Sequence, residues 1–174
     1  MNRANIKAFI DALIERHKLK KFPVDIDAWL KIAGAELKEV SREDLDGLSG
    51  FAYQKKGVKI IGVNLDEPVE RRRFTIGHEL GHMFLHKDRT VSYDRSSLML
   101  RPSAHVGRGA DSKEIEANAF AAELLMAEDA VRSDVERMGG LDLEDQEKIA
   151  ELAESYGVSI PAMTIRLTTL YFDS

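Results

Sequence analysis

The chain has 174 residues, no cysteine and a formal net charge of −5 at pH 7. This length suits a single domain with a buried core, and we expect residues 1–174 to form one. The lack of cysteine excludes disulfide bonds and thiolate metal ligands, and the acidic balance gives no general attraction for nucleic acid. No apolar run reaches the roughly 20 residues that cross a bilayer, and no apolar signal region follows Met1, so we expect a cytoplasmic protein with no membrane partner.

The first third of the sequence predicts two helices followed by a small sheet. Apolar residues recur at helical spacing from about residue 5 to 18 and from 25 to 33, where Gly34 is placed to end the helix. Residues 51–53 and 58–63 are typical of β-strands, joined by a hairpin turn at residues 55–57. Residues 39–48 are charged enough to predict a loop. An edge strand of this sheet could bind an extended peptide by main-chain pairing.

A central helix is predicted from Pro68 to His86, because proline suits the first turn of a helix and an apolar pattern follows it. Three arginines at 71–73 are expected to be surface charge that packs against acidic side chains. Residues 87–112 have no sustained periodicity. A loop of this length directly after the central helix is a candidate lid.

The remaining sequence predicts helices that begin near Ser112 and continue over residues 128–138, 143–156 and 159–170. Within 141–170, residues 152–163 resemble a helix-turn-helix, with Gly157 at the turn. The second helix of that motif has Arg166 as its only charge, and residues 141–174 contain seven acids against two bases. We therefore do not expect direct DNA binding, and interpret the motif as packing or as a surface for a partner protein.

The central helix contains the sequence His-Glu-x-x-His at His78, Glu79 and His82. At about 100° per residue, the two histidines lie one turn apart on the same helix face and can bind one metal ion. Glu79 beside them is the candidate general base. The alternative, that these are core or surface residues of a metal-free helical protein, is disfavoured because apolar residues flank the intact motif.

A catalytic zinc site needs a third protein ligand and leaves the fourth position to water. The helix that begins near Ser112 offers two carboxylates, Glu114 and Glu116. Asn118 lies four residues after Glu114 on the same face, where it could accept a hydrogen bond from a ligand imidazole. This spacing favours Glu114 as the third ligand, with Glu116 as the alternative.

Other residues near the motif are candidates for supporting roles. His86 follows His82 by four residues but lies about 12 Å along the helix from His78, so we expect it to pack or to support a ligand. Tyr93 and His105, in the predicted loop, are candidate donors to the oxyanion that forms during peptide hydrolysis.

Two stretches resemble the ImmA/IrrE family of zinc metallopeptidases: residues 71–86, which contain the His-Glu-x-x-His motif, and residues 116–126. The likeness extends over most of the chain from about Val24 and departs at Ala127, where the family often has proline. The resemblance implies an α+β, zincin-like fold, mostly helical, with a small sheet beside the motif helix. It also implies the third-ligand pattern on Glu114 and Asn118, and cleavage of a repressor-type regulatory protein in a bacterial or phage-related setting.

The predicted function is a zinc-dependent endopeptidase that hydrolyses a peptide bond in a regulatory protein. In this prediction His78, His82 and Glu114 bind Zn²⁺, and Glu79 moves the proton of the attacking water. The alternative is a catalytically weak metallopeptidase-like module that regulates by binding a partner protein or DNA.

Overall fold

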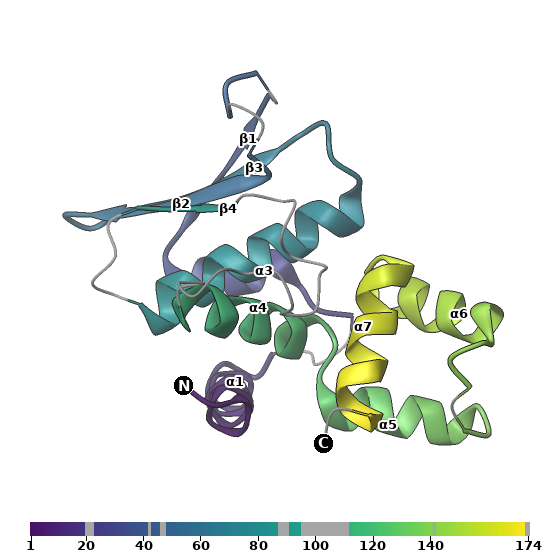
Figure 1. The fold of residues 1–174 in the computed structure, drawn as a ribbon. Coiled ribbons are helices and arrows are strands. Elements are labelled where there is room, and N and C mark those ends of the chain that lie inside the picture. Colours follow the sequence, from purple (N-terminus) through teal and green to yellow (C-terminus); the bar gives the residue numbers. More distant parts are fainter. Residues whose placement is uncertain are drawn as a thin grey trace.

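The computed structural model describes residues 1–19, 23–41, 43–45, 48–86, 91–94, 112–140 and 142–172. Helices dominate these ranges, and a small sheet packs beside the motif helix, which confirms the predicted α+β class (Figure 1). None of the described helices is both long enough and apolar enough to span a bilayer. The elements in chain order are α1 (Arg3–His17), α2 (Ile26–Ala33), β1 (Glu36–Val40), β2 (Gly50–Lys55), β3 (Val58–Asn64), α3 (Val69–Leu85), β4 (Val91–Asp94), α4 (Ser112–Leu125), α5 (Glu128–Arg137), α6 (Gln146–Tyr156) and α7 (Ile160–Tyr171).

The described sheet has four strands in the order β1-β3-β2-β4, so β1 and β4 are its edges. β1 pairs parallel to β3, whereas β2 pairs antiparallel to both β3 and β4. The predicted β2–β3 hairpin is confirmed: Lys56 and Gly57 have φ of 50° and 84°, as a two-residue turn with both central residues at positive φ requires. Two loop predictions are wrong in part: β1 extends to Val40, two residues into the predicted loop at 39–48, and β4 occupies residues 91–94 of the stretch predicted to be an irregular lid.

Helix α3 packs closely against the sheet because small residues lie at the contact. A β-carbon at Gly50 of β2 would lie 2.5 Å from Cγ2 of Thr75 and 2.6 Å from the Gly62 carbonyl oxygen. A side chain does not fit there, so glycine allows the fully buried Thr75 to approach the strand. The sheet lies on one side of α3, and α4 and α1 lie on the other (Figure 1).

An aromatic cluster joins the N-terminal helices to the motif helix and to α4. The ring of Phe84 stacks on Phe120 with centroids 5.7 Å apart, and it meets Phe9 and Trp29 edge-on at 6.0 and 6.1 Å. These offset and edge-on contacts stabilise the packing beyond burial alone. The cluster connects α1, α2, α3 and α4, and so fixes α3 against α4.

Arg73 ties the motif helix to the C-terminal helices instead of lying on the surface. Its Nε donates to the carbonyl of Gly157, at the end of α6, and its side chain also donates to the carbonyl of Val24, both at 3.1 Å. Burial lowers the pKa of this guanidinium from its ordinary value. The expectation of surface charge is therefore wrong for Arg73, whereas Arg71 and Arg72 do pair with carboxylates.

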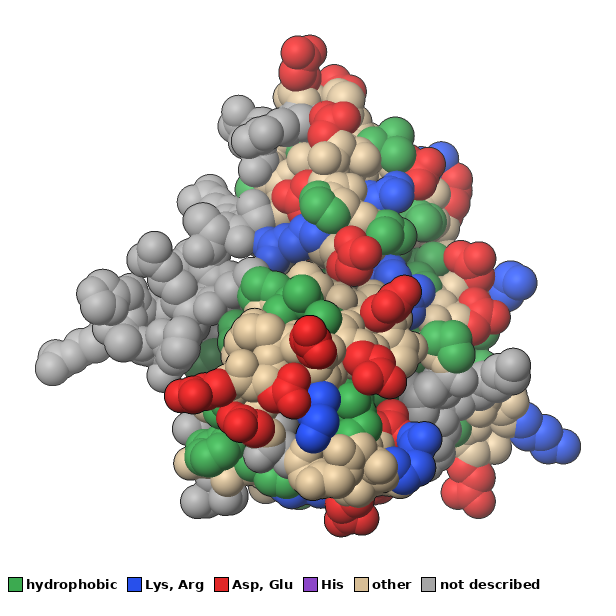
Figure 2. All heavy atoms as spheres, turned by 90° about the vertical axis from the view of Figure 1, so that its right-hand side faces the viewer, with side chains coloured by type: hydrophobic (Ala, Val, Ile, Leu, Met, Phe, Trp, Pro, Cys, Tyr) green, Lys and Arg blue, Asp and Glu red, His purple; other side chains and the backbone are tan. Residues whose placement is uncertain are grey.

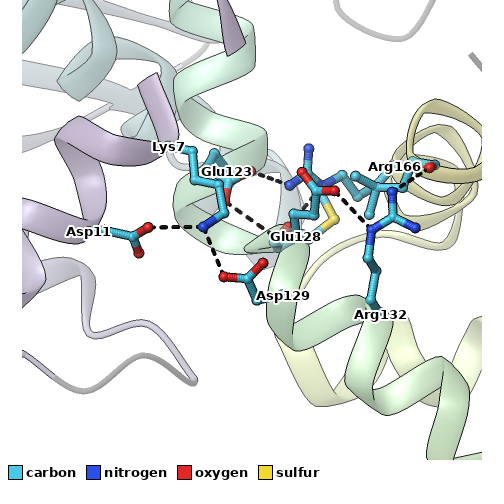
Figure 3. A network of polar contacts seen from close by, with 9 residues as sticks. Lys7, Asp11, Glu123, Glu128, Asp129, Arg132 and Arg166 are labelled. Atoms are coloured by element: carbon cyan, nitrogen blue, oxygen red, sulfur yellow. Dashed lines mark hydrogen bonds and ion pairs between the residues drawn. The ribbon is translucent and has the colours of Figure 1, made fainter. Parts of the chain in front are cut away.

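Arg166 of α7 also points inward. It is 7% exposed, donates from Nε to the Met126 carbonyl at 2.8 Å, and forms an ion pair with Glu123 of α4 (Figure 3). Glu123 in turn accepts a hydrogen bond from the main-chain N–H of Glu128, the first residue of α5, at 3.2 Å. One buried ion pair thus connects α4, α5 and α7.

Candidate metal centre

His78 and His82 lie one turn apart on α3 and face each other. Their Nε2 atoms are 3.0 Å apart. Both residues are almost fully buried, with exposed fractions of 1% for His78 and 2% for His82. Two bare imidazole nitrogens repel each other at this distance, so the pair needs a proton or a cation between them. The helix spacing expected from the sequence therefore places two ligand-type atoms at one point.

Glu114, in the first turn of α4, completes this group. Its Oε2 lies 3.2 Å from Nε2 of His78 and 3.2 Å from Nε2 of His82. Among the described residues, these three side chains form a group whose ligand atoms all lie within 4.8 Å of one another. Glu116, the alternative third ligand, lies elsewhere: its carboxylate contacts His86 and the Met1 ammonium.

The three atoms fit a small divalent cation. Zinc binds imidazole nitrogen and carboxylate oxygen at about 2.0–2.2 Å, which places the ligands of a tetrahedral ion roughly 3.3 Å from one another. The three separations here, 3.0, 3.2 and 3.2 Å, are within a few tenths of an ångström of that value. Two imidazoles and one carboxylate are also a donor set that zinc prefers, and three protein ligands leave a position for solvent.

Asn118 supports the first histidine. Its Oδ1 lies 2.9 Å from Nδ1 of His78, so the imidazole can donate its Nδ1–H to the amide oxygen. That hydrogen bond leaves Nε2 of His78 without a proton and directed at Glu114 and His82. α4 thus supplies both the carboxylate of the group and the acceptor that orients His78.

The second histidine contacts a third one. Nδ1 of His86 lies 3.2 Å from Nδ1 of His82, and Nε2 of His86 lies 2.9 Å from Oε2 of Glu116. Hydrogen bonds from the Met1 ammonium and then from His86 lower the pKa of the Glu116 carboxyl below its usual value. The His86–Glu116 contact was missed in the sequence, because spacing along α3 says nothing about which α4 side chain its last turn meets.

The remaining predicted residues differ in how far the structure describes them. Glu79 is fully buried on α3, next in sequence to His78. Tyr93 belongs to β4, where its backbone pairs with Phe51, but its side chain lies outside the described part. His105, with most of the candidate lid, also lies outside the described residues.

Glycine at position 81 sets the distance between α3 and α4. A β-carbon there would lie 3.0 Å from Cα and 3.1 Å from the carbonyl oxygen of Ala117, which sits between Glu114 and Asn118. At Gly77, one turn earlier, the nearest atom is the β-carbon of Ala121 at 3.4 Å, an ordinary contact.

We expect Gly81→Ala to be less stable than Gly77→Ala by about 1–3 kcal/mol, because only the first overpacks the helix interface. Both variants gain the same helix propensity, about 1 kcal/mol, so this term cancels in the comparison. Gly81→Ala should also bind zinc more weakly, since it displaces the helix that carries Glu114. Urea denaturation and calorimetric zinc titration measure the two effects, and equal behaviour of the two variants would contradict this account.

Comparison with known proteins agrees with the geometry. The model of the IrrE N-terminal-like domain matches residues 38–168, a range that includes α3 and α4 and most of the chain. Among curated proteins, Metallopeptidase ImmA from Bacillus subtilis (strain 168) is 29% identical over 90 residues, which cover 51% of this chain and 48% of that protein. The chain therefore spans about half the length of the curated relative it matches. With the family model matched over the sheet and the motif helix alike, the chain belongs to the ImmA/IrrE family of metallopeptidases.

Proposed function

We propose that this chain is a zinc-dependent endopeptidase that cleaves a repressor-type regulatory protein in the cytoplasm. The observation that carries the proposal is the convergence of two imidazole nitrogens and one carboxylate oxygen at 3.0–3.2 Å, with the buried Glu79 directly following His78 on α3. Family membership supports a peptidase, and the donor set of nitrogen and oxygen atoms supports zinc as its metal.

In this proposal His78, His82 and Glu114 hold the metal. A bound zinc ion supplies Lewis acidity, which polarises the scissile carbonyl and makes water nucleophilic near neutral pH. Asn118 keeps the proton of His78 on Nδ1, so that Nε2 stays available as a ligand atom.

Glu79 performs the proton transfers. Its carboxylate takes a proton from the attacking water and then delivers it to the amine that leaves when the peptide bond breaks. Glu79 is fully buried, which shields its carboxylate from bulk solvent and limits proton exchange during the transfer. Tyr93 and His105 remain candidate donors to the developing oxyanion.

The edge strand β4 is the proposed place for the substrate backbone. It lies against α3 in the fold and pairs with β2 on one side only among the described strands. An extended peptide could add to its other side by main-chain hydrogen bonds, which would lay the scissile bond across the metal site.

The experiment that tests the proposed function uses the purified protein and a repressor-type regulator encoded next to it. We expect cleavage of the regulator by the zinc-loaded protein, loss of cleavage after chelation, and its return when zinc is added back. The fragments are identified by mass spectrometry. Cleavage that persists in excess chelator would contradict the metal-dependent mechanism. A regulator that stays intact under all conditions would contradict its identification as the substrate.

We propose that the helix-turn-helix-like segment does not bind DNA. Arg166, the only charged residue among 160–170, has its guanidinium buried against Glu123 and the Met126 carbonyl, where it cannot reach phosphate. Figure 2 shows the face of the molecule that carries the C-terminal helices, and on its described part acidic and basic side chains are mixed rather than gathered into a basic surface. A salt-dependent gel shift with duplex DNA would contradict this proposal.

A further inference from the structure

A chain of polar contacts leads away from the metal-binding group on the side of His82. Nδ1 of His82 faces Nδ1 of His86 at 3.2 Å, and Nε2 of His86 faces Oε2 of Glu116 at 2.9 Å. His86 is 5% exposed, so its ring is held between these two partners and not by solvent. This series of contacts thus leads from α3 to α4 and ends at the carboxylate of Glu116.

We propose that His86 and Glu116 form a positioning pair that keeps the ring proton of His82 on Nδ1, and so keeps Nε2 of His82 available as a metal ligand. The inference deepens the proposed function and rests on the metal site described above. It assigns roles to two residues that do not belong to the ligand group.

The proton positions follow from what each atom can donate or accept. A carboxylate only accepts, so the contact with Glu116 requires the proton of a neutral His86 to be on Nε2. Nδ1 of His86 is then bare and can only accept, which requires His82 to donate from its own Nδ1. With its single proton on Nδ1, His82 presents a lone pair at Nε2, where His78 and Glu114 converge.

The two ligand histidines are therefore oriented by hydrogen bonds to different kinds of partner. His78 donates directly to the amide oxygen of Asn118, whereas His82 donates to an imidazole whose own tautomer is fixed by Glu116. Removing a partner that orients a ligand histidine typically costs 10–100-fold in metal affinity. We expect the positioning pair to be as important for the metal affinity of His82 as Asn118 is for that of His78.

The first test measures zinc affinity in variants of the full chain. His86→Phe keeps a ring but offers no acceptor, and should weaken zinc binding by about 10–100-fold. His86→Asn places an amide oxygen near the position of Nδ1 and should restore most of the affinity. If His86→Phe bound zinc as tightly as the wild type, or if His86→Asn bound it as weakly as His86→Phe, the proposal would be overturned.

A double-mutant cycle tests whether Glu116 acts through His86. Glu116→Leu should weaken zinc binding in the wild-type background and have no further effect in His86→Phe, because the residue it orients is gone. Glu116→Gln, which retains an acceptor oxygen, should bind zinc more tightly than Glu116→Leu. Losses that simply add in the double variant would show that the two residues act separately and would overturn the pairing.

Nuclear magnetic resonance of the ¹⁵N-labelled, zinc-loaded protein gives a readout independent of activity. We expect a scalar coupling between the two Nδ1 atoms of His82 and His86 across their hydrogen bond, and we expect Glu116→Leu to weaken or abolish it. Absence of the coupling in the wild-type protein would overturn the proposal.

Arg73→Met is the matched control for a packing effect, since Arg73 lies half-buried on α3 and contacts main-chain carbonyls away from the site. It should lower stability but leave zinc affinity unchanged. A loss of affinity equal to that of His86→Phe would mean that weakened packing explains both, and the pair would have no positioning role.

The outcomes separate this inference from the proposed function. A wild-type protein that bound no divalent metal would overturn both. A wild-type protein that binds zinc and cleaves its regulator, together with an unaffected His86→Phe variant, would overturn the positioning pair alone.

Discussion

Replacing Glu79 with glutamine is expected to reduce peptide cleavage by about 10²- to 10⁴-fold, the usual contribution of a general acid–base residue. The substitution preserves the shape of a fully buried side chain but removes the carboxylate that we propose takes and returns the proton. Glu79 does not belong to the group formed by His78, His82 and Glu114. The zinc content of the variant should therefore stay the same. The measurement is the single-turnover rate of regulator cleavage, with elemental analysis of zinc in the same samples.

Glu70→Gln is the matched control, because Glu70 lies in the first turn of the same helix, two turns before the motif. It makes the same chemical change outside the site and should leave the cleavage rate unchanged. Undiminished cleavage by Glu79→Gln with full zinc content would show that another group moves the proton. Loss of zinc from Glu79→Gln would show that Glu79 belongs to the ligand set.

The local parts of the site were predictable because they depend on helix geometry alone. His78 and His82 are four residues apart on one helix, and so are Glu114 and Asn118 on another. A period of 3.6 residues places each pair on one face whatever the rest of the chain does. The structure brings these two faces together, with Asn118 at 2.9 Å from the imidazole of His78.

The parts that sequence reasoning missed depend on contacts between distant segments. β4 has four residues and no alternating pattern long enough to distinguish a strand from a loop, so only its pairing with β2 defines it. His86 meets Glu116, and Arg73 meets Gly157, across gaps of 30 and 84 residues. Charged residues are usually exposed, so no local pattern indicated that Arg73 or Arg166 would be buried.

The buried ion pair between α4 and α7 carries the largest expected effect on stability. We expect Arg166→Met to lower the free energy of unfolding by about 3–5 kcal/mol, because it leaves the Glu123 carboxylate buried without its counter-ion. The Met126 carbonyl also loses the donor that now lies 2.8 Å away. Urea denaturation followed by circular dichroism measures the change.

Arg132→Met provides the matched comparison, since it makes the same change at a more exposed arginine, whose side chain is 39% exposed against 7% for Arg166. Arg132 pairs with Glu128 at 2.8 Å, donates to the Leu170 carbonyl at 2.7 Å and lies over the ring of Tyr171. Because its side chain is this exposed, solvent screens these contacts, and their loss should cost about 1–2 kcal/mol, less than the loss of the buried pair. A similar cost for the two variants would contradict the role given to burial.

The double variant Glu123→Gln/Arg166→Met separates the cost of an unpaired charge from the cost of lost packing. Glutamine keeps an acceptor for the main-chain N–H of Glu128 but carries no charge, so nothing ionised remains buried between the helices. We therefore expect the double variant to be more stable than Arg166→Met alone, although it has one more substitution. If the double variant were less stable, the carboxylate of Glu123 would not be the source of the loss, and packing of the Arg166 side chain would have to explain how α7 is held against α4.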